Sequence, residues 1–115
     1  MQHSSLKYIL DIERVIHEIE EFKELVENDF EIYRVQVVVK RAIERNLEII
    51  GEAVRNLKQI NPDVKISSSR KIIGLRNLIL HAYDTVEDEL IWGIIQKDIP
   101  VLKIETDNLK KGESR

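Results

Sequence analysis

The chain has 115 residues, 43% of them hydrophobic, which suffices for one domain with one core and is too few for two. Because it contains no cysteine, the sequence excludes disulfide scaffolds, thiolate zinc sites and cysteine nucleophiles. It has no apolar run of about 20 residues, and its opening segment, MQHSSLKYIL, lacks the basic start and apolar stretch of a signal peptide. We therefore expect a cytoplasmic protein that does not enter a membrane.

The charge is distributed unevenly along the chain. A formal net charge of −3 argues against a nucleic-acid partner, because such proteins usually present excess Lys and Arg to phosphates. Residues 34–76, however, hold ten Lys and Arg against four Asp and Glu, whereas the two flanks hold eight basic and seventeen acidic residues. Either this basic middle presents one positive face to an anionic ligand, or its charges are spread over solvated helix faces.

The pattern of apolar residues predicts an all-α fold, an antiparallel up-and-down bundle of four to five helices. The whole chain has four Gly and two Pro, and apolar residues recur at helical rather than alternating spacing. The first helix is predicted over 5–27, ended by Asn28 and Asp29, and Asp29 is positioned to cap the next helix. Its apolar stripe comprises Ile9, Ile12, Ile16, Ile19 and Val26.

The second helix, over 30–60, is predicted to be the longest. A second stripe on it, Arg45, Glu48, Glu52 and Arg55, either forms ion pairs on a wet surface or lies beside a site. Gly51 is costly inside a helix, so we expect another backbone or a ligand to come close there. The apolar seam of this helix comprises Val39, Ile43, Leu47, Ile50, Val54 and Leu57.

The clear break at 60–70, INPDVKISSSR, separates the second helix from a third over 69–82. Thr85 and Asp88 resemble the polar pair that opens a helix. The fourth helix has a kink or break at Pro100. We expect one domain over 1–109 and a frayed tail over 110–115. The apolar residues of the fourth helix are Leu90, Ile91, Ile94, Ile95 and Leu102.

The third helix contains the stretch RNLILHAY, residues 76–83, and is apolar nearly all round, which is typical of a buried element. Its narrow polar face holds Gly74, Asn77 and His81. On an ideal helix Arg76 and His81 point about 140° apart. Either the helix ends near His81 and the ring swings back, or a second copy completes the pair across a symmetric dimer, with Gly74 allowing its backbone to approach.

These residues suffice for phosphodiester chemistry without a metal. An arginine such as Arg76 binds a phosphate through paired hydrogen bonds, and a histidine such as His81 can accept a proton from a ribose 2′-hydroxyl or give one to a leaving oxygen. Asn77 is placed to orient the ring. The structural alternatives are a buried Arg and His pair and, for Tyr83, an amphipathic residue at a helix end.

Three segments resemble one family. RNLILHAY matches the motif of the HepT-like branch of the HEPN superfamily: Arg, four residues, His, one residue, Tyr. RNLEIIGEA, residues 45–53, is similar to the second-helix signature of that branch, and IIQKDIPVLK, residues 94–103, resembles its closing segment. The resemblance covers nearly the whole chain in the expected order.

The resemblance implies a helical bundle that forms a dimer or a larger oligomer, with the motifs of two subunits facing one cleft. It implies a cofactor-free, metal-independent endoribonuclease, the toxin of a type VII toxin–antitoxin system. Arg76 would bind the scissile phosphate, His81 would be the acid/base, and Asn77 would support them. Tyr83 would receive AMP from the antitoxin, a minimal nucleotidyltransferase. The alternatives are a non-catalytic nucleotide-binding or substrate-binding subunit of a nucleotidyltransferase complex and a structural dimerisation module.

Overall fold

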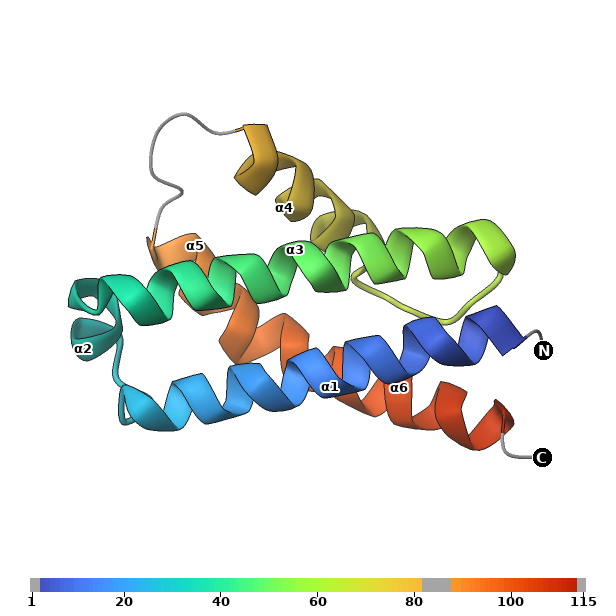
Figure 1. Ribbon diagram of the computed structural model, residues 1–115, viewed down its shortest axis with the longest axis horizontal. Helices are drawn as coiled ribbons and strands as arrows, with labels where there is room; N and C mark the ends of the chain where they lie inside the picture. The colour runs from blue at the N-terminus through green and yellow to red at the C-terminus, as the bar shows by residue number, and fades with distance from the viewer. Residues whose placement is uncertain (1–2, 82–87, 114–115) are drawn as a thin grey trace.

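The computed structural model describes residues 3–81 and 88–113 and has the all-α fold that the sequence predicts. Within these ranges the chain is helical with short turns and contains no β-strand (Figure 1). The elements are α1 (His3–Leu25), α2 (Phe30–Val35), α3 (Val37–Ile60), α4 (Ser69–His81), α5 (Asp88–Gly93), one turn of π-helix η1 (Ile94–Asp98) and α6 (Ile99–Glu113).

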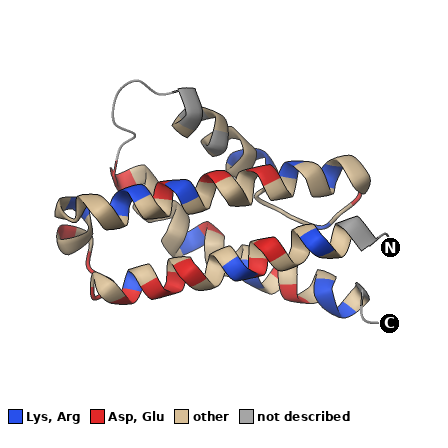
Figure 2. Cartoon of the chain, viewed as in Figure 1, with Lys and Arg blue, Asp and Glu red and all other residues tan. Residues whose placement is uncertain are grey.

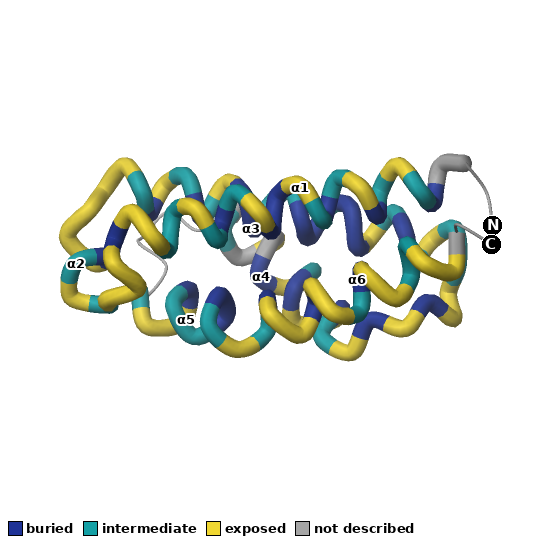
Figure 3. Tube along the Cα trace, turned by 90° about the horizontal axis from the view of Figure 1, so that it is seen from below, coloured by how far each residue is buried: buried dark blue, intermediate teal, exposed yellow. Residues whose placement is uncertain are grey.

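Three long helices form the body of the molecule. Helices α1 and α3 run antiparallel along the longest dimension, 44 Å, and α6 packs along α1 (Figure 1). The buried residues of these helices face the inside of the bundle (Figure 3). Helix α4 packs chiefly on α3, at an angle, and so forms an outer element of the fold.

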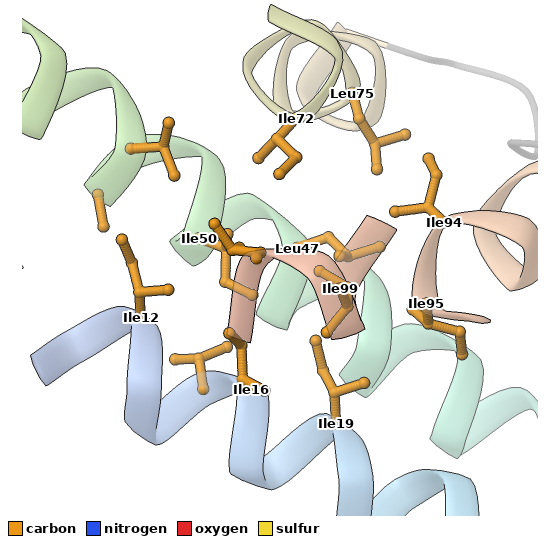
Figure 4. Close-up of a cluster of buried hydrophobic side chains, with 14 of the residues drawn as sticks. Ile12, Ile16, Ile19, Leu47, Ile50, Ile72, Leu75, Ile94, Ile95 and Ile99 are labelled. Atoms are coloured by element: carbon orange, nitrogen blue, oxygen red, sulfur yellow. The ribbon is translucent and has the colours of Figure 1, made fainter. Parts of the chain in front are cut away.

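The core is built mainly from isoleucine side chains contributed by every long helix (Figure 4). The predicted stripe of α1 is buried throughout, and the predicted seam of α3 is buried except for the half-exposed Val39. Helix α4 contributes Ile72 and Leu75, which lie above Leu47 of α3 (Figure 4). This apolar contact fixes α4 against the bundle.

The turn between α1 and α2 is set by local sequence, as predicted. Glu27 and Asn28 adopt left-handed backbone angles, with φ of 56° and 50°. Asp29 then caps α2, since its Oδ1 accepts hydrogen bonds from the backbone N–H of Glu31 at 2.8 Å and of Ile32 at 3.2 Å.

The prediction of one helix over 30–60 is wrong, because the chain breaks at Gln36 (φ −95°, ψ 85°). Two contacts accompany this break. The break lets Tyr33 become fully buried, with its ring centroid 5.0 Å from that of Trp92 in α5. It also frees the carbonyl of Arg34 to accept a hydrogen bond from Lys40 Nζ at 3.3 Å.

The kink expected at Pro100 takes the form of the π-turn η1. Pro100 has no N–H and its ring would crowd the preceding turn, so the ladder widens and Ile99 N donates to Ile94 O. The tail predicted to fray after Leu109 is instead helical as far as Glu113. Lys110 holds it, with Nζ 2.9 Å from Glu13 Oε1 on α1.

Replacing Ile50, which is fully buried, tests the assignment of the core. We expect Ile50→Ala to lower the free energy of unfolding by about 3 to 4 kcal/mol, because it leaves a cavity between α3 and its neighbours. Val38→Ala, at a side chain that is 81% exposed, should change it by less than about 0.5 kcal/mol. Urea unfolding followed by circular dichroism measures both, and equal losses would contradict the packing described.

Candidate active site

Helix α4 positions three of the four residues singled out by the sequence. Arg76, Asn77 and His81 all lie on it, and His81 is its last residue. Tyr83 lies outside the described residues. Because α4 is a regular α-helix from Ser69 onward, positions 76 and 81 lie about 140° apart around its axis. The two positions are therefore within two turns of each other but on different sides of one helix.

The α4 side chains that the structure describes differ in burial. Ile72 and Leu75 are buried against the bundle, whereas Ile73 and Ile79 are half-buried and pack against the core. Gly74 and Asn77 are exposed, as the predicted polar face requires at these two positions. Helix α4 packs chiefly on α3 (Figure 1).

The start of α4 and the two residues before it are held by polar contacts that the sequence did not indicate. Glu105 Oε2 on α6 accepts a hydrogen bond from the backbone N–H of Ser67 at 2.9 Å. Asp98 accepts one from Ser68 Oγ at 3.4 Å, and its other oxygen lies 2.9 Å from Lys71 Nζ. The π-turn and α6 therefore contact the N-terminal end of the helix that carries the motif.

The α3 surface beside α4 shows why Gly51 is tolerated. Lys58 Nζ lies 3.4 Å from Ser69 Oγ, which identifies the side of α3 that meets the start of α4. Gly51 precedes Lys58 by two helical turns and is buried, so it lies on that same side. This placement supports the expectation that another element comes close at the glycine.

The polar stripe of α3 contains one of the ion pairs that were expected as one of its two interpretations. Arg45 Nη1 lies 3.0 Å from Glu48 Oε2. One turn earlier and outside the stripe, Arg41 Nη1 lies 2.6 Å from Glu44 Oε2. The arginine side chains are 70% and 51% exposed, the glutamates only 16% and 15%. The positive groups are therefore outermost. Figure 2 shows Lys and Arg along α3 and at the start of α4, whereas Asp and Glu are frequent on α1.

A buried ion pair joins α3 to the start of α5. Lys40 is 9% exposed, and its Nζ lies 3.0 Å from Oδ1 and 3.1 Å from Oδ2 of Asp88. Burial raises the pKa of the neighbouring Tyr33 hydroxyl, and the charges of Asp88 and Glu44 raise it further, so this group stays protonated. Sequence reasoning missed Lys40, although its spacing of seven from Leu47 signals the same buried face.

His17 does not take part in this arrangement. His17 lies on α1, with Nε2 3.4 Å from Glu21 Oε1 and Nδ1 3.9 Å from Glu20 Oε1. In the parts of the chain that the structure describes, no group of three or more His, Asp or Glu side chains could hold a metal ion. Among the same residues, none of the helices is both long and apolar enough to cross a membrane.

Comparison with known proteins identifies the class to which this fold and motif belong. The family model described as "Ribonuclease HepT-like" matches residues 12–109. The chain is 34% identical to "Probable ribonuclease HepT" of Thermococcus cleftensis, over 96% of this chain and 100% of the relative. Two relatives named "Putative RNase" come from Caldanaerobacter subterraneus (35% identity, 89% of this chain, 93% of the relative) and Methanocaldococcus jannaschii (30%, 87% and 91%).

The chain therefore belongs to the HepT-like ribonuclease family, as its motifs predicted. No solved structure matches it closely enough to add to this assignment.

Removing Lys40 tests the buried pair. Lys40→Met leaves the Asp88 carboxylate partly buried without its cation, and we expect a loss of about 2 to 3 kcal/mol in the free energy of unfolding. Lys40→Met with Asp88→Asn removes both charges and should recover at least about 1 kcal/mol. Lys7→Met breaks an exposed pair on α1 and should cost about 0.5 kcal/mol or less. A loss for Lys40→Met no greater than that for Lys7→Met would contradict the role of the pair.

Proposed function

We propose that this protein is a metal-independent endoribonuclease that acts in the cytoplasm as the toxin of a toxin–antitoxin pair. The observation that carries the proposal is that one continuous helix, α4, presents Arg76, Asn77 and His81 at the edge of the bundle in a member of a ribonuclease family. The chain supplies a phosphate-binding cation and a group that titrates near neutrality, the two functions that RNA cleavage by its own 2′-hydroxyl requires.

In the proposed reaction Arg76 binds the non-bridging oxygens of the scissile phosphate and stabilises the negative charge that develops there. A histidine takes the proton of the ribose 2′-hydroxyl as its oxygen attacks phosphorus, and an acid returns a proton to the departing 5′-oxygen. The products are a 2′,3′-cyclic phosphate and a 5′-hydroxyl. His81 fills the acid/base role, and Asn77 supports the orientation of its ring.

We propose that two copies of the chain share one cleft. The regular backbone of α4 directs Arg76 and His81 about 140° apart, so a second α4 facing the first would let Arg76 of one copy approach His81 of the other. The exposure of Gly74 and Asn77 on α4 supports this arrangement. A side chain added at Gly74 would meet no described atom within 4 Å, so this point of α4 is accessible to another backbone.

RNA binding by a chain of net charge −3 depends on where its cations lie. Arg41 and Arg45 on α3 extend outward beyond their glutamate partners, and Arg70 and Lys71 are exposed at the start of α4. Arg70 and Lys71 lie on the helix that carries the motif. Exposed cations of this kind can neutralise backbone phosphates, and binding should therefore weaken as salt rises.

Tyr83 provides the proposed control of activity. A cognate minimal nucleotidyltransferase would transfer AMP from ATP to the Tyr83 hydroxyl and release pyrophosphate. Tyr83 follows His81 by two residues, so each added phosphate brings negative charge to the neighbourhood of the motif. That charge would compete with RNA for Arg76 and repel the substrate backbone.

Cleavage of single-stranded RNA in excess EDTA tests the activity. We expect the AMP-free protein to cleave, Arg76→Ala and His81→Ala each to lower kcat at least about 100-fold, and Arg14→Ala, at an exposed arginine on α1, to cleave normally. An RNA with 2′-deoxyribose at the scissile position should resist cleavage there.

Undiminished cleavage by both α4 variants would overturn the assignment of the site.

The net charge of −3 favours a second candidate, a non-catalytic nucleotide-binding subunit of a nucleotidyltransferase complex. That candidate gains if the purified protein binds such a partner and cleaves no RNA with or without divalent metal.

Intact mass after co-expression with the neighbouring nucleotidyltransferase tests the regulation. We expect mass increments of one or more AMP units that disappear in Tyr83→Phe and remain in Tyr8→Phe, a tyrosine on α1. The modified protein should regain cleavage when phosphodiesterase removes AMP. An unmodified chain from co-expression with a demonstrably active partner would contradict the proposal.

A further inference from the structure

Helix α4 is attached to the rest of the molecule in two different ways. Its middle rests on α3 through apolar contacts of Ile72 and Leu75. Such contacts depend on area and allow small tilts, because they are not directional. The two residues before α4, Ser67 and Ser68, donate hydrogen bonds to Glu105 and Asp98, and such bonds are directional. Lys71 in its first turn adds an ion pair with Asp98.

The two carboxylates lie on one face of the closing helix. Asp98 is the last residue of η1, and Glu105 follows it by seven residues in α6, so the pair is separated by two turns, about 10 Å along the axis. Glu105 binds the backbone N–H of Ser67, and Asp98 binds Ser68 Oγ and Lys71 Nζ. The bonded groups on the other side belong to Ser67, Ser68 and Lys71, so the attachment covers the two residues before α4 and its first turn.

The two anchoring carboxylates are each partly buried. The Asp98 side chain is 17% exposed. Glu105 Oε1 is buried and forms no hydrogen bond within the described part of the chain, while Oε2 accepts the bond from Ser67. Charge-assisted hydrogen bonds are stronger than those between neutral groups, and so they resist bending of the attachment.

The motif lies toward the C-terminal end of α4. Arg76 is seven residues from Ser69 and His81 is twelve, so their backbones lie about 10 and 18 Å from the anchored turn. A tilt of about 5° at the first turn would move the backbone of His81 by about 1.5 Å. A displacement of about 1 Å in a reacting group can slow a reaction about 100-fold.

We propose that Asp98 and Glu105 are positioning residues, which set the direction of α4 and thereby the places of Arg76 and His81. This inference rests on the proposed function for its effect on catalysis. The direction of α4 is a property of the fold and can be measured separately.

The test compares two double variants. Asp98→Ala with Glu105→Ala removes the anchors between the closing helix and α4. The matched control, Glu13→Ala with Glu20→Ala, removes two carboxylates that bind Lys110 at 2.9 Å and Lys103 at 2.7 Å, also on α6, but join it to α1. Both double variants raise the net charge by the same amount, so the control is matched in long-range attraction of RNA. The anchor variant also frees Lys71, and KM is therefore measured separately from kcat.

Kinetics and spin-label distances are the two measurements. We expect the anchor variant to lower kcat at least about 10-fold with KM for RNA changed less than about 3-fold, and the control to keep both. Asp98→Asn with Glu105→Gln keeps oxygen acceptors at both places and should recover most of kcat. If the anchor double variant does not give a helical circular dichroism spectrum, Asp98→Ala alone replaces it.

Because the chain has no cysteine, spin labels can be placed at Gly74→Cys on α4 and Leu10→Cys on α1, with unlabelled protein in excess to suppress signals between copies. The distance distribution should shift or broaden in the anchor variant only. An unchanged distribution, or an equal change in the control, would overturn the inference. A shifted distribution with unchanged kcat would overturn it too. If the wild-type protein cleaves no RNA, the proposed function fails, and the distances still decide whether the anchors direct α4.

Discussion

Helix α3 is covered on two sides, by α1 along one and by α4 along the other, and the positions of the remaining elements follow from this double burial. Its apolar side chains repeat at steps of three and four and supply surface to both neighbours. Ile50 and Val54 are fully buried, and the buried Gly51 lies on the side that meets α4. Without α3, the helix that carries the motif would have little apolar surface to rest on.

The polar contacts add direction to this apolar packing. Lys40 and Asp88 tie α3 to α5, and Asp98 and Glu105 tie the closing helix to the start of α4. All four groups are largely sheltered, and each has a partner of opposite charge or a hydrogen-bond donor, as buried charges require. The acidic residues of this chain therefore include structural anchors, and its exposed arginines on α3 lie outside their glutamate partners.

The parts of the fold that depend on local sequence were predictable. The stripe of α1, the cap at Asp29 and the start of α4 at Ser69 each follow from residues within a few positions of one another. The break at Gln36 could not be predicted from local sequence, because it depends on Tyr33 packing against Trp92, far along the chain. For the same reason the end of α6 was placed too early, since Lys110 finds its partner, Glu13, near the other end of the sequence.

The candidate site likewise has one part that the sequence predicted and one part that it did not. The motif identified the residue types at 76, 77 and 81, and the structure places them on one helix at the edge of the bundle. The anchors at Asp98 and Glu105 could not be read from spacing, because a carboxylate on a helix is usually solvated. Only the three-dimensional path of residues 67–71 brings backbone and hydroxyl donors to them.

The central claim is that catalysis requires Arg76 from one copy and His81 from another, and mixing two inactive variants tests it most directly. Arg76→Ala and His81→Ala proteins would be unfolded together, refolded in equal amounts and assayed against RNA. If the cleft is shared, half of the random dimers contain one complete site, and activity should return to about a quarter of the wild-type value. A mixture as inactive as its components, beside a fully active wild-type control refolded in the same way, would contradict the claim and place both residues of the site within one chain.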